Sequence, residues 1–194
     1  MKRPLVVGIS GASGVIYGIR LLEALKDHAE VATHLVVTKP AERTIAEETS
    51  WDLGAVRALA SVVHPVGDVG ASIASGSFLT MGMVVVPCSM RTVAAVAYCQ
   101  ADNLLTRAAD VTLKEGRKLV LVVRETPLHR GHLKALLAAG ENGATILPPM
   151  PAFYTMPQSV AEIVDHTVAR ILDQFGIGHG LSSRWSGARP DLKL

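Results

Sequence analysis

The sequence of 194 residues contains little cysteine, few aromatic residues and almost no net charge. Two cysteines, Cys88 and Cys99, are too few for a disulfide framework, as is typical of proteins in a reducing compartment. Aromatic residues make up 4%, too little for a platform that stacks single-stranded bases. With 19 Lys and Arg against 17 Asp and Glu, no overall basic field attracts nucleic acid or anionic lipid. We therefore expect neither a nucleic-acid nor a membrane partner.

Long apolar runs are also missing, and no stretch approaches the roughly 18 residues that cross a bilayer. The apolar run after Met1-Lys2-Arg3 is too short for a signal peptide, because Ser and Gly residues interrupt it after Ile9. The hydrophobic fraction of 49% is ample for a buried core. We expect a soluble, cytoplasmic protein with a single domain over residues 1–194.

Short runs rich in Val, Leu and Ile alternate with longer segments of helical period, which is typical of parallel βαβ units. The predicted strands are Leu5–Ile9, Ala32–Val37, Val62–Val66, Met83–Val86, Leu119–Val123 and Ala144–Leu147. The predicted helices are Val15–Asp27, Ala41–Glu48, Leu53–Leu59, Thr92–Cys99, Leu104–Glu115, His132–Glu141 and Ser159–Phe175. This pattern predicts a three-layer α/β/α fold with a doubly wound parallel sheet, Rossmann- or flavodoxin-like, which binds ligands at the carboxyl ends of its strands. The segment from about residue 176, with Gly, Ser and Pro, is predicted to be a flexible tail that projects outward.

The first predicted strand runs into a turn, Gly11-Ala12-Ser13-Gly14, that precedes a helix. Glycines let a backbone approach a ligand closely, and a helix N-terminus supplies free N–H groups, so the turn suits a phosphate. A purely structural turn has the same pattern. A Walker-type loop is excluded because no Lys follows Gly14, and a dinucleotide site is disfavoured because no acidic residue ends the second strand.

Polar side chains follow other strands at the same predicted edge. Thr38 follows the second strand, and Ser89 and Thr92 follow the fourth. The hydroxyls of Ser89 and Thr92 fit helix caps, and together with that of Thr38 they also fit the binding of a phosphate and a polyol. Arg124 and Glu125 follow the fifth strand, either as an ion pair delivered to this edge or as a solvated loop pair.

Three further groups leave alternatives open. Arg107 and Lys114 share one helix face, where Asp110 could pair with both or where the two cations could clamp a phosphate. His129 and His132 stand three residues apart, but no third ligand is evident, so we predict no metal site. Cys88 fits either a buried strand end or a low-pKa nucleophile beside a helix start.

Short motifs recur in one order along the chain: Gly11-Ala12-Ser13-Gly14, Ser75-Gly76-Ser77, Pro87-Cys88-Ser89, Arg107-Ala108-Ala109-Asp110, Leu113-Lys114-Glu115, Arg124-Glu125-Thr126-Pro127-Leu128 and Pro151-Ala152-Phe153-Tyr154. From about Leu5 to Trp185 the chain resembles the UbiX/Pad-type flavin prenyltransferases. The resemblance implies an enzyme that joins the dimethylallyl group of dimethylallyl monophosphate to N5 and C6 of reduced FMN without a metal. It also implies dodecamers with shared active sites, and a product, prenylated FMN, that serves UbiD-type decarboxylases.

The resemblance also implies roles for individual residues. Those matching flavin-binding positions are Gly11, Ala12, Ser13, Thr38, Ser89, Thr92 and Arg124, and those matching positions around the prenyl phosphate are Ser75, Arg107, Lys114, Tyr154 and Arg170. Catalytic positions are matched by Glu48, Glu125, Ser13 and Trp185. Tyr154 and Arg170 are expected to reach a neighbouring subunit's site. Gly116 and Thr155 depart from the family pattern, in which a basic residue and His are frequent.

Two other functions compete with this interpretation. An FMN-dependent cysteine decarboxylase has a related fold, but its Pro-Ala-Ser-Ala-Asn-Thr segment is replaced here by Pro87-Cys88-Ser89-Met90-Arg91-Thr92, which lacks the Asn. A non-catalytic FMN carrier subunit would keep the flavin site. It would have no use for a second phosphate pocket, and substitution of Lys114 or Arg170 discriminates the two possibilities.

Overall fold

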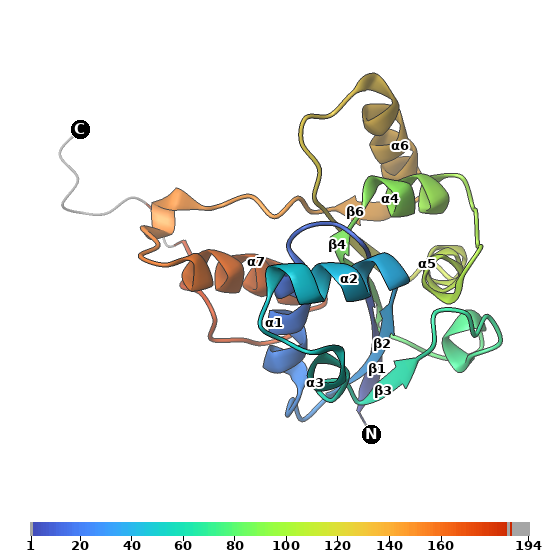
Figure 1. Cartoon of the computed structure of the whole chain (residues 1–194), viewed down its shortest axis with the longest axis horizontal. Helices are drawn as coiled ribbons and strands as arrows, with labels where there is room; N and C mark the ends of the chain where they lie inside the picture. Colours follow the sequence, from blue (N-terminus) through green and yellow to red (C-terminus); the bar gives the residue numbers. More distant parts are fainter. Residues whose placement is uncertain (1, 186, 188–194) are drawn as a thin grey trace.

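The computed structural model describes residues 2–185 and residue 187, and these form a sheet with helices on both faces (Figure 1). Its parallel strands are β1 (Arg3–Ile9), β2 (Val31–Val37), β3 (Val62–His64), β4 (Gly82–Cys88), β5 (Lys118–Val123) and β6 (Ala144–Ile146). The strand order β3-β2-β1-β4-β5-β6 confirms the predicted doubly wound sheet. The chain proceeds outward from β1 on one side and from β4 on the other, so the switch point of the topology lies between β1 and β4.

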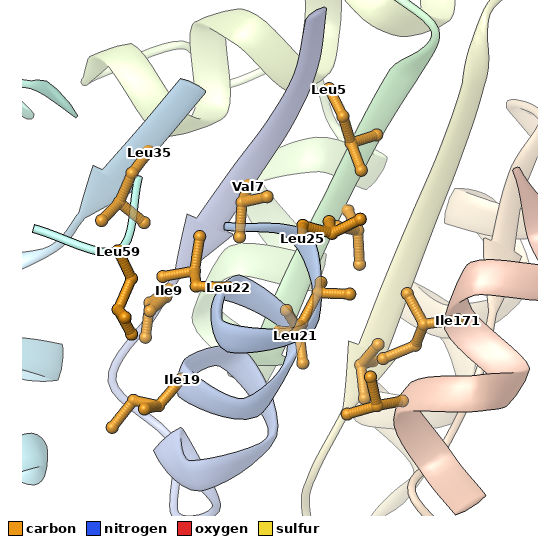
Figure 2. Close-up of a cluster of buried hydrophobic side chains, with 14 of the residues drawn as sticks. Leu5, Val7, Ile9, Ile19, Leu21, Leu22, Leu25, Leu35, Leu59 and Ile171 are labelled. Carbon is orange, nitrogen blue, oxygen red and sulfur yellow. The ribbon is translucent and has the colours of Figure 1, made fainter. Parts of the chain in front are cut away.

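Alternate side chains of each strand enter two separate cores, because successive residues point to opposite faces of a sheet. Leu5, Val7 and Ile9 of β1 pack against α1 (Val15–Leu25), α2 (Lys39–Glu48), α3 (Leu53–Arg57) and α7 (Val160–Gln174), and Figure 2 shows this core around α1. Val6 faces the other core, with α4 (Met90–Ala97), α5 (Leu104–Lys114) and α6 (Arg130–Glu141). The layers therefore place α5 and α7 on opposite faces of the sheet.

Several predicted boundaries move by one or two residues for local reasons. Strand β3 ends at His64 because Pro65 has no N–H to donate to the sheet. Helix α6 begins at Arg130 because the Nδ1 atom of His129 accepts hydrogen bonds from the backbone N–H groups of Gly131 and His132, at 3.0 and 3.4 Å. His129 is thus a helix cap. Two short 3₁₀ turns, η1 (Ser72–Ala74) and η2 (Phe153–Thr155), were not predicted.

The segment after Gly176 does not project outward over the part that the structure describes. Ile177 is buried against the core of α7, and the Nε2 atom of His179 lies 3.2 Å from an Asp173 carboxylate oxygen. The ring of Trp185 meets that of Tyr154 edge to face. The apolar Ile177 side chain explains the return of the chain. Residues 186 and 188–194 of the predicted flexible tail lie outside the described residues.

Candidate active site

A cavity of about 400 Å³ lies at the switch point of the sheet. The carboxyl ends of β1, β2 and β4 and the start of α5 line it, through residues that include Ser10, Gly11, Thr38, Ser89, Thr92 and Asn103. We call it the switch-point cavity. Its volume is in the range of small-molecule sites. Gly11, Thr38, Ser89 and Thr92 were all predicted at this edge, and the structure brings them together.

Ser10 joins the two central strands at the floor of this cavity. Its buried hydroxyl donates a hydrogen bond to the Pro87 carbonyl (3.0 Å) and accepts one from the backbone N–H of Ser89 (2.8 Å). Sequence reasoning did not single out Ser10. A serine directly after a fully apolar strand, at a position that the fold buries, is the signal that could have found it.

Thr38 and Ser89 are helix caps whose side chains also line the cavity. The Thr38 hydroxyl accepts a hydrogen bond from the Ala41 N–H at the start of α2 (3.4 Å). The Ser89 hydroxyl accepts one from the Thr92 N–H at the start of α4 (3.3 Å) and lies 3.1 Å from the Thr92 hydroxyl. Because two helix N-termini meet the cavity, their dipoles favour an anionic group there.

The turn after β1 is held by the carboxylate of Glu48, the last residue of α2. Its Oε2 atom accepts a hydrogen bond from the Gly14 backbone N–H at 2.8 Å. Ala12 and Ser13 lie in this turn but are not among the residues that line the cavity. The structure therefore places Ser13 and Glu48 next to each other along the turn, beside the cavity and not inside it.

Arg124 and Glu125 lie beyond the carboxyl end of β5, as predicted, and of the two alternatives they form a solvated loop pair and not an ion pair. The Arg124 backbone N–H donates to the Cys88 carbonyl (3.2 Å), which keeps the ends of β4 and β5 adjacent. The Glu125 carboxylate instead accepts a hydrogen bond from the Thr126 N–H (3.0 Å). Both residues are exposed, and no other described side chain forms an ion pair with either.

The two cysteines differ in burial. Cys88 is fully buried at the end of β4, and this burial raises the pKa of its thiol far above the usual range. A thiol that does not ionise is not a nucleophile, so the buried interpretation is correct. Cys99 is exposed.

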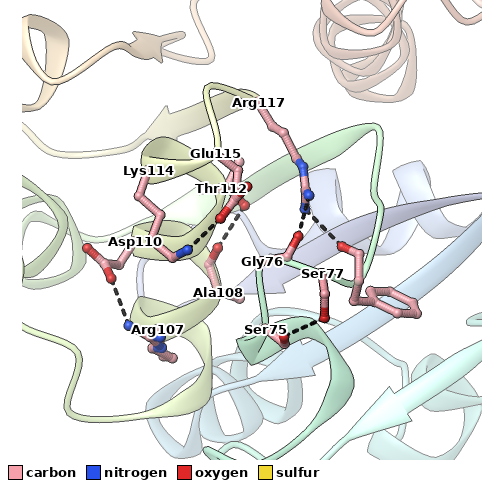
Figure 3. Close-up of polar contacts among 11 residues, drawn as sticks. Ser75, Gly76, Ser77, Arg107, Ala108, Asp110, Thr112, Lys114, Glu115 and Arg117 are labelled. Carbon is pink, nitrogen blue, oxygen red and sulfur yellow. Dashed lines mark hydrogen bonds and ion pairs between the residues drawn. The ribbon is translucent and has the colours of Figure 1, made fainter.

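A second group of predicted residues lies on α5 and on the loop after η1, as Figure 3 shows. Arg107 pairs with Asp110 (3.0 Å), whereas Lys114 pairs with Glu115, so Asp110 does not serve both cations as one interpretation had it. The Lys114 ammonium, through its hydrogen bond and charge, lowers the pKa of the Glu115 carboxyl. Both cations are partly exposed, with 38% and 47% of their side chains accessible.

The loop after η1 carries Ser75 and Ser77, whose hydroxyl oxygens lie 2.9 Å apart. Between them, Gly76 packs so closely against α5 that a Cβ atom there would collide with the Glu115 carboxylate and the Lys114 ammonium. Gly76, the neighbour of Ser75, therefore lies close to the ends of the Glu115 and Lys114 side chains.

A third group, Tyr154, Arg170, Asp173 and Trp185, surrounds a cavity of about 290 Å³ on α7; we call it the α7 cluster. The Tyr154 hydroxyl lies 3.2 Å from Nε2 of His166, and the rings of Tyr154 and Trp185 stand 5.4 Å apart at 80°. Arg170 forms an ion pair with Asp173 at 2.8 Å.

Asp173 also binds the C-terminal segment. One of its carboxylate oxygens lies 2.7 Å from the Arg184 guanidinium and 3.2 Å from His179. Burial acts to raise the pKa of Asp173, but the hydrogen bonds from Arg184 and His179 outweigh it and the pKa lies below the usual value. Asp173 was not predicted from the sequence, since an Asp three residues after an Arg on a helix is common on solvated faces.

The positions that depart from the family pattern have local structural roles. Gly116 has a φ angle of 63°, in the left-handed region that favours glycine, and it follows α5 directly. The Thr155 hydroxyl donates a hydrogen bond to the Ala152 carbonyl (2.8 Å) within η2. Neither residue contributes a side chain to the cavities described above.

A family model described as Flavoprotein matches residues 1–172. The flavin prenyltransferase UbiX of Escherichia coli K12 is 55% identical over 190 residues, which cover 97% of this chain and 100% of the relative. This chain belongs to the flavin prenyltransferase family. The resemblance drawn from the motifs is confirmed.

Solved structures of similar proteins agree with this membership. AnUbiX (PadA1), in complex with FMN and dimethylallyl pyrophosphate, matches with a TM-score of 0.95 and 47% identity over 97% of this chain and 100% of that one. A dodecameric, FMN-dependent UbiX-like decarboxylase from Escherichia coli O157:H7 matches with a TM-score of 0.93 and 52% identity, covering 95% and 100%. The peptidyl-cysteine decarboxylase EpiD, at 15% identity and a TM-score of 0.63 over 90% and 99%, shares the fold alone.

The chemistry of the switch-point cavity fits the FMN of a flavin prenyltransferase. Hydroxyl groups of Thr38, Ser89 and Thr92 suit a polyol, and two helix N-termini suit a phosphate. Within the described residues, no three His, Cys, Asp or Glu side chains gather as metal ligands, and no helix is long and apolar enough to cross a membrane.

Proposed function

We propose that this chain transfers the dimethylallyl group of dimethylallyl monophosphate to reduced FMN. The observation that carries the proposal is the switch-point cavity, whose hydroxyl groups and capped helix N-termini suit FMN, in a chain that is similar over its full length to flavin prenyltransferases. When bound, reduced FMN supplies the nucleophilic N5 and C6 atoms. The prenyl C–O bond breaks with its electron pair on the phosphate, so the residues of this chain must bind that anion and manage the released protons.

The flavin phosphate and ribityl chain are bound by the residues of the switch-point cavity and its rim. These are Gly11, Ala12, Ser13, Thr38, Ser89, Thr92 and Arg124. The dipoles of α2 and α4, whose N-termini meet the cavity, attract the anion, and the exposed Arg124 adds a cation at the neighbouring strand end.

The leaving phosphate is stabilised by Ser75, Arg107, Lys114, Tyr154 and Arg170. Charge-assisted hydrogen bonds from Arg and Lys strengthen as negative charge develops on the phosphate, which lowers the barrier to C–O cleavage. The exposed ring of Trp185 stabilises the allylic carbon, whose positive character favours an aromatic face and is worth up to about 2 kcal/mol when desolvated.

Proton transfer is assigned to acidic groups near the strand ends. Glu125, beyond β5, handles the proton of N5, and the released phosphate accepts the proton of C6. Glu48 is assigned to the reacting centre, and the support for this is the turn that it binds at Gly14, beside Ser13.

The residues that bind the prenyl phosphate come from more than one copy of the chain. Arg107 and Lys114 lie on α5, and Arg170 lies on α7, which covers the opposite face of the sheet (Figure 1). One copy therefore cannot bring them together, but a closed assembly can. We propose the dodecamer of the UbiX-like relative, with α7 clusters completing neighbouring sites.

The product, prenylated FMN, is proposed to pass to a UbiD-type decarboxylase in the cytoplasm. Support for this step comes from the family membership, because prenylated FMN is consumed by decarboxylases of that type. Pull-down of the purified chain with such a decarboxylase, with and without product, tests the transfer.

The proposed reaction is tested by anaerobic incubation with chemically reduced FMN and dimethylallyl monophosphate. Mass spectrometry of the released flavin should show a gain of one prenyl unit with the wild-type chain and with the control Arg3→Ala, at the far end of β1. Lys114→Ala should bind FMN but form little product, because it lacks a phosphate contact. Unmodified FMN from the wild-type chain would favour the carrier or the cysteine decarboxylase.

Subunit mixing tests the shared site. Lys114→Ala and Arg170→Ala chains should each be inactive, and refolding them together should restore activity at the sites that combine two intact surfaces. No recovery, with mixed assemblies verified by native mass spectrometry, would place all phosphate residues of one site on one chain.

A further inference from the structure

The loop that carries Ser75 is held in place by a residue with no assigned role, Arg117. Arg117 lies immediately before β5 and is half-buried. One guanidinium nitrogen donates to the Gly76 carbonyl at 2.6 Å and another donates to the Phe78 carbonyl at 2.8 Å (Figure 3). These bonds join positions that are 41 and 39 residues apart in the chain.

The guanidinium makes these two bonds because its N–H groups form a rigid planar fork. A fork on two carbonyls of one loop fixes the orientation of the peptide groups between them. Ser75 directly precedes the clamped stretch, which runs from Gly76 to Phe78. The Ser75 hydroxyl lies 2.9 Å from the hydroxyl of Ser77, which is part of that stretch. The clamp therefore also determines where the Ser75 hydroxyl lies.

On its other side the loop lies against the ends of the Glu115 and Lys114 side chains. A Cβ atom at Gly76 would overlap the Glu115 carboxylate and approach the Lys114 ammonium. The ring of Phe78 packs on that of the buried His34 at 5.2 Å, which anchors the far end of the loop. Loss of the Arg117 clamp would thus free Ser75–Ser77 while leaving Phe78 in place.

We propose that Arg117 is a positioning residue for the prenyl phosphate: it clamps the Ser75–Phe78 loop so that the Ser75 hydroxyl and the Lys114 ammonium meet the same anion. This inference rests on the proposed function and adds a residue to it. Arg117 acts through the loop backbone, since both of its bonds go to carbonyl oxygens and none to a carboxylate or to the site.

The test compares Arg117→Ala, Arg117→Lys and the control Arg3→Ala, each as the FMN-loaded assembly. Binding of dimethylallyl monophosphate is measured by isothermal titration calorimetry, and loop opening by hydrogen exchange of the peptide covering residues 72–80. Arg117→Ala should weaken binding of the monophosphate about tenfold, the effect of roughly one lost hydrogen bond. Exchange in residues 72–80 should rise, and FMN affinity should stay within twofold of wild type.

Arg117→Lys separates clamping from charge. Lys retains the cation but lacks the fork, so we expect faster loop exchange and intermediate affinity. If Arg117→Lys binds dimethylallyl monophosphate with wild-type affinity although its loop exchanges fast, only the charge of residue 117 matters. If hydrogen exchange is unchanged in Arg117→Ala, the loop needs no clamp. Either result overturns the proposal. If wild-type chain binds no dimethylallyl monophosphate, the proposed function fails instead, while the exchange data still decide whether Arg117 clamps the loop.

Discussion

The switch-point cavity and the α7 cluster both contain predicted site residues, yet they are built in opposite ways. In the cavity, polar side chains bind the backbone of their own fold: Ser10 joins β1 to β4, and Ser89 caps α4. In the α7 cluster, Tyr154, Arg170 and Trp185 remain 51–61% exposed, and their polar contacts are to other side chains.

Because of this difference, substitutions in the two regions should affect stability and function differently. A cavity residue serves the fold and the ligand with the same atoms, so its loss should affect both. An exposed residue of the α7 cluster, such as Arg170, contributes little to folding, because exposed ion pairs are worth little. Its loss should affect the reaction alone. The substitutions below would sharpen this contrast or break it.

Arg170→Ala should have the largest effect, on turnover. Loss of one cation facing the leaving phosphate should lower kcat about 10²-fold, while the melting temperature stays near that of wild type. Activity with dimethylallyl monophosphate and differential scanning fluorimetry measure the two quantities. A matching fall in melting temperature would show that the cluster is structural after all.

Ser10→Ala should reduce both stability and flavin affinity. The substitution removes two hydrogen bonds, one to the Pro87 carbonyl and one from the half-buried Ser89 N–H, which costs about 1–3 kcal/mol of unfolding free energy. Denaturant unfolding and FMN titration measure the effect, with the exposed Ser50→Ala as control. A stable variant that loses only FMN affinity would contradict the dual role.

Ser89→Ala should have a similar but smaller dual effect. Removal of the cap on α4 should lower unfolding free energy by about 1 kcal/mol, and FMN affinity should fall because a cavity hydroxyl is lost. Ser89→Thr keeps an oxygen at the cap and should recover most of the stability. Loss of stability without any change in FMN affinity would remove Ser89 from the flavin site.

Protonation of Asp173 should have the smallest effect of the changes tested, and in the wild-type chain it should be visible only at acidic pH. Because its pKa lies below the usual 3.8, its contacts with Arg184 and His179 form above that pH and are lost as pH falls through the lowered pKa. Trp185 fluorescence in a Trp51→Phe background should stay constant from pH 7 to about 4 and then change, while circular dichroism at the same pH reports global folding.

Asp173→Asn provides the comparison for this titration. It should show the acid-like Trp185 signal at neutral pH, because the amide carries no charge for Arg184. A wild-type transition near pH 6 would contradict the assignment to Asp173.

The sequence predicted the sheet well because its central strands are buried on both faces and read as continuous apolar runs, as in Val84–Val86 and Leu119–Val123. Strand-end hydroxyls such as Thr38 and Ser89 were placed correctly, since parallel topology brings strand ends to one edge. The ends of β3 and α6 depended on Pro65 and on the cap by His129, which a periodicity analysis does not weigh.

Contacts between distant elements were beyond reach from the sequence. No local pattern tells that Arg117 binds the loop of Gly76, or that Asp173 binds Arg184. The candidate roles of Tyr154, Arg170 and Trp185 came from family resemblance. Spacing could not supply them, because these residues meet only through tertiary packing.

The hydroxyl of Ser10 has a consequence for how the protein folds. It bonds to residues 77 and 79 positions away, across the boundary between the two halves of the sheet. Contacts of such long sequence separation form late, since loop closure must precede them. The switch-point cavity is therefore completed only when both halves have docked, and if it is the flavin site, a nascent chain that exposes only the first half should have no affinity for FMN.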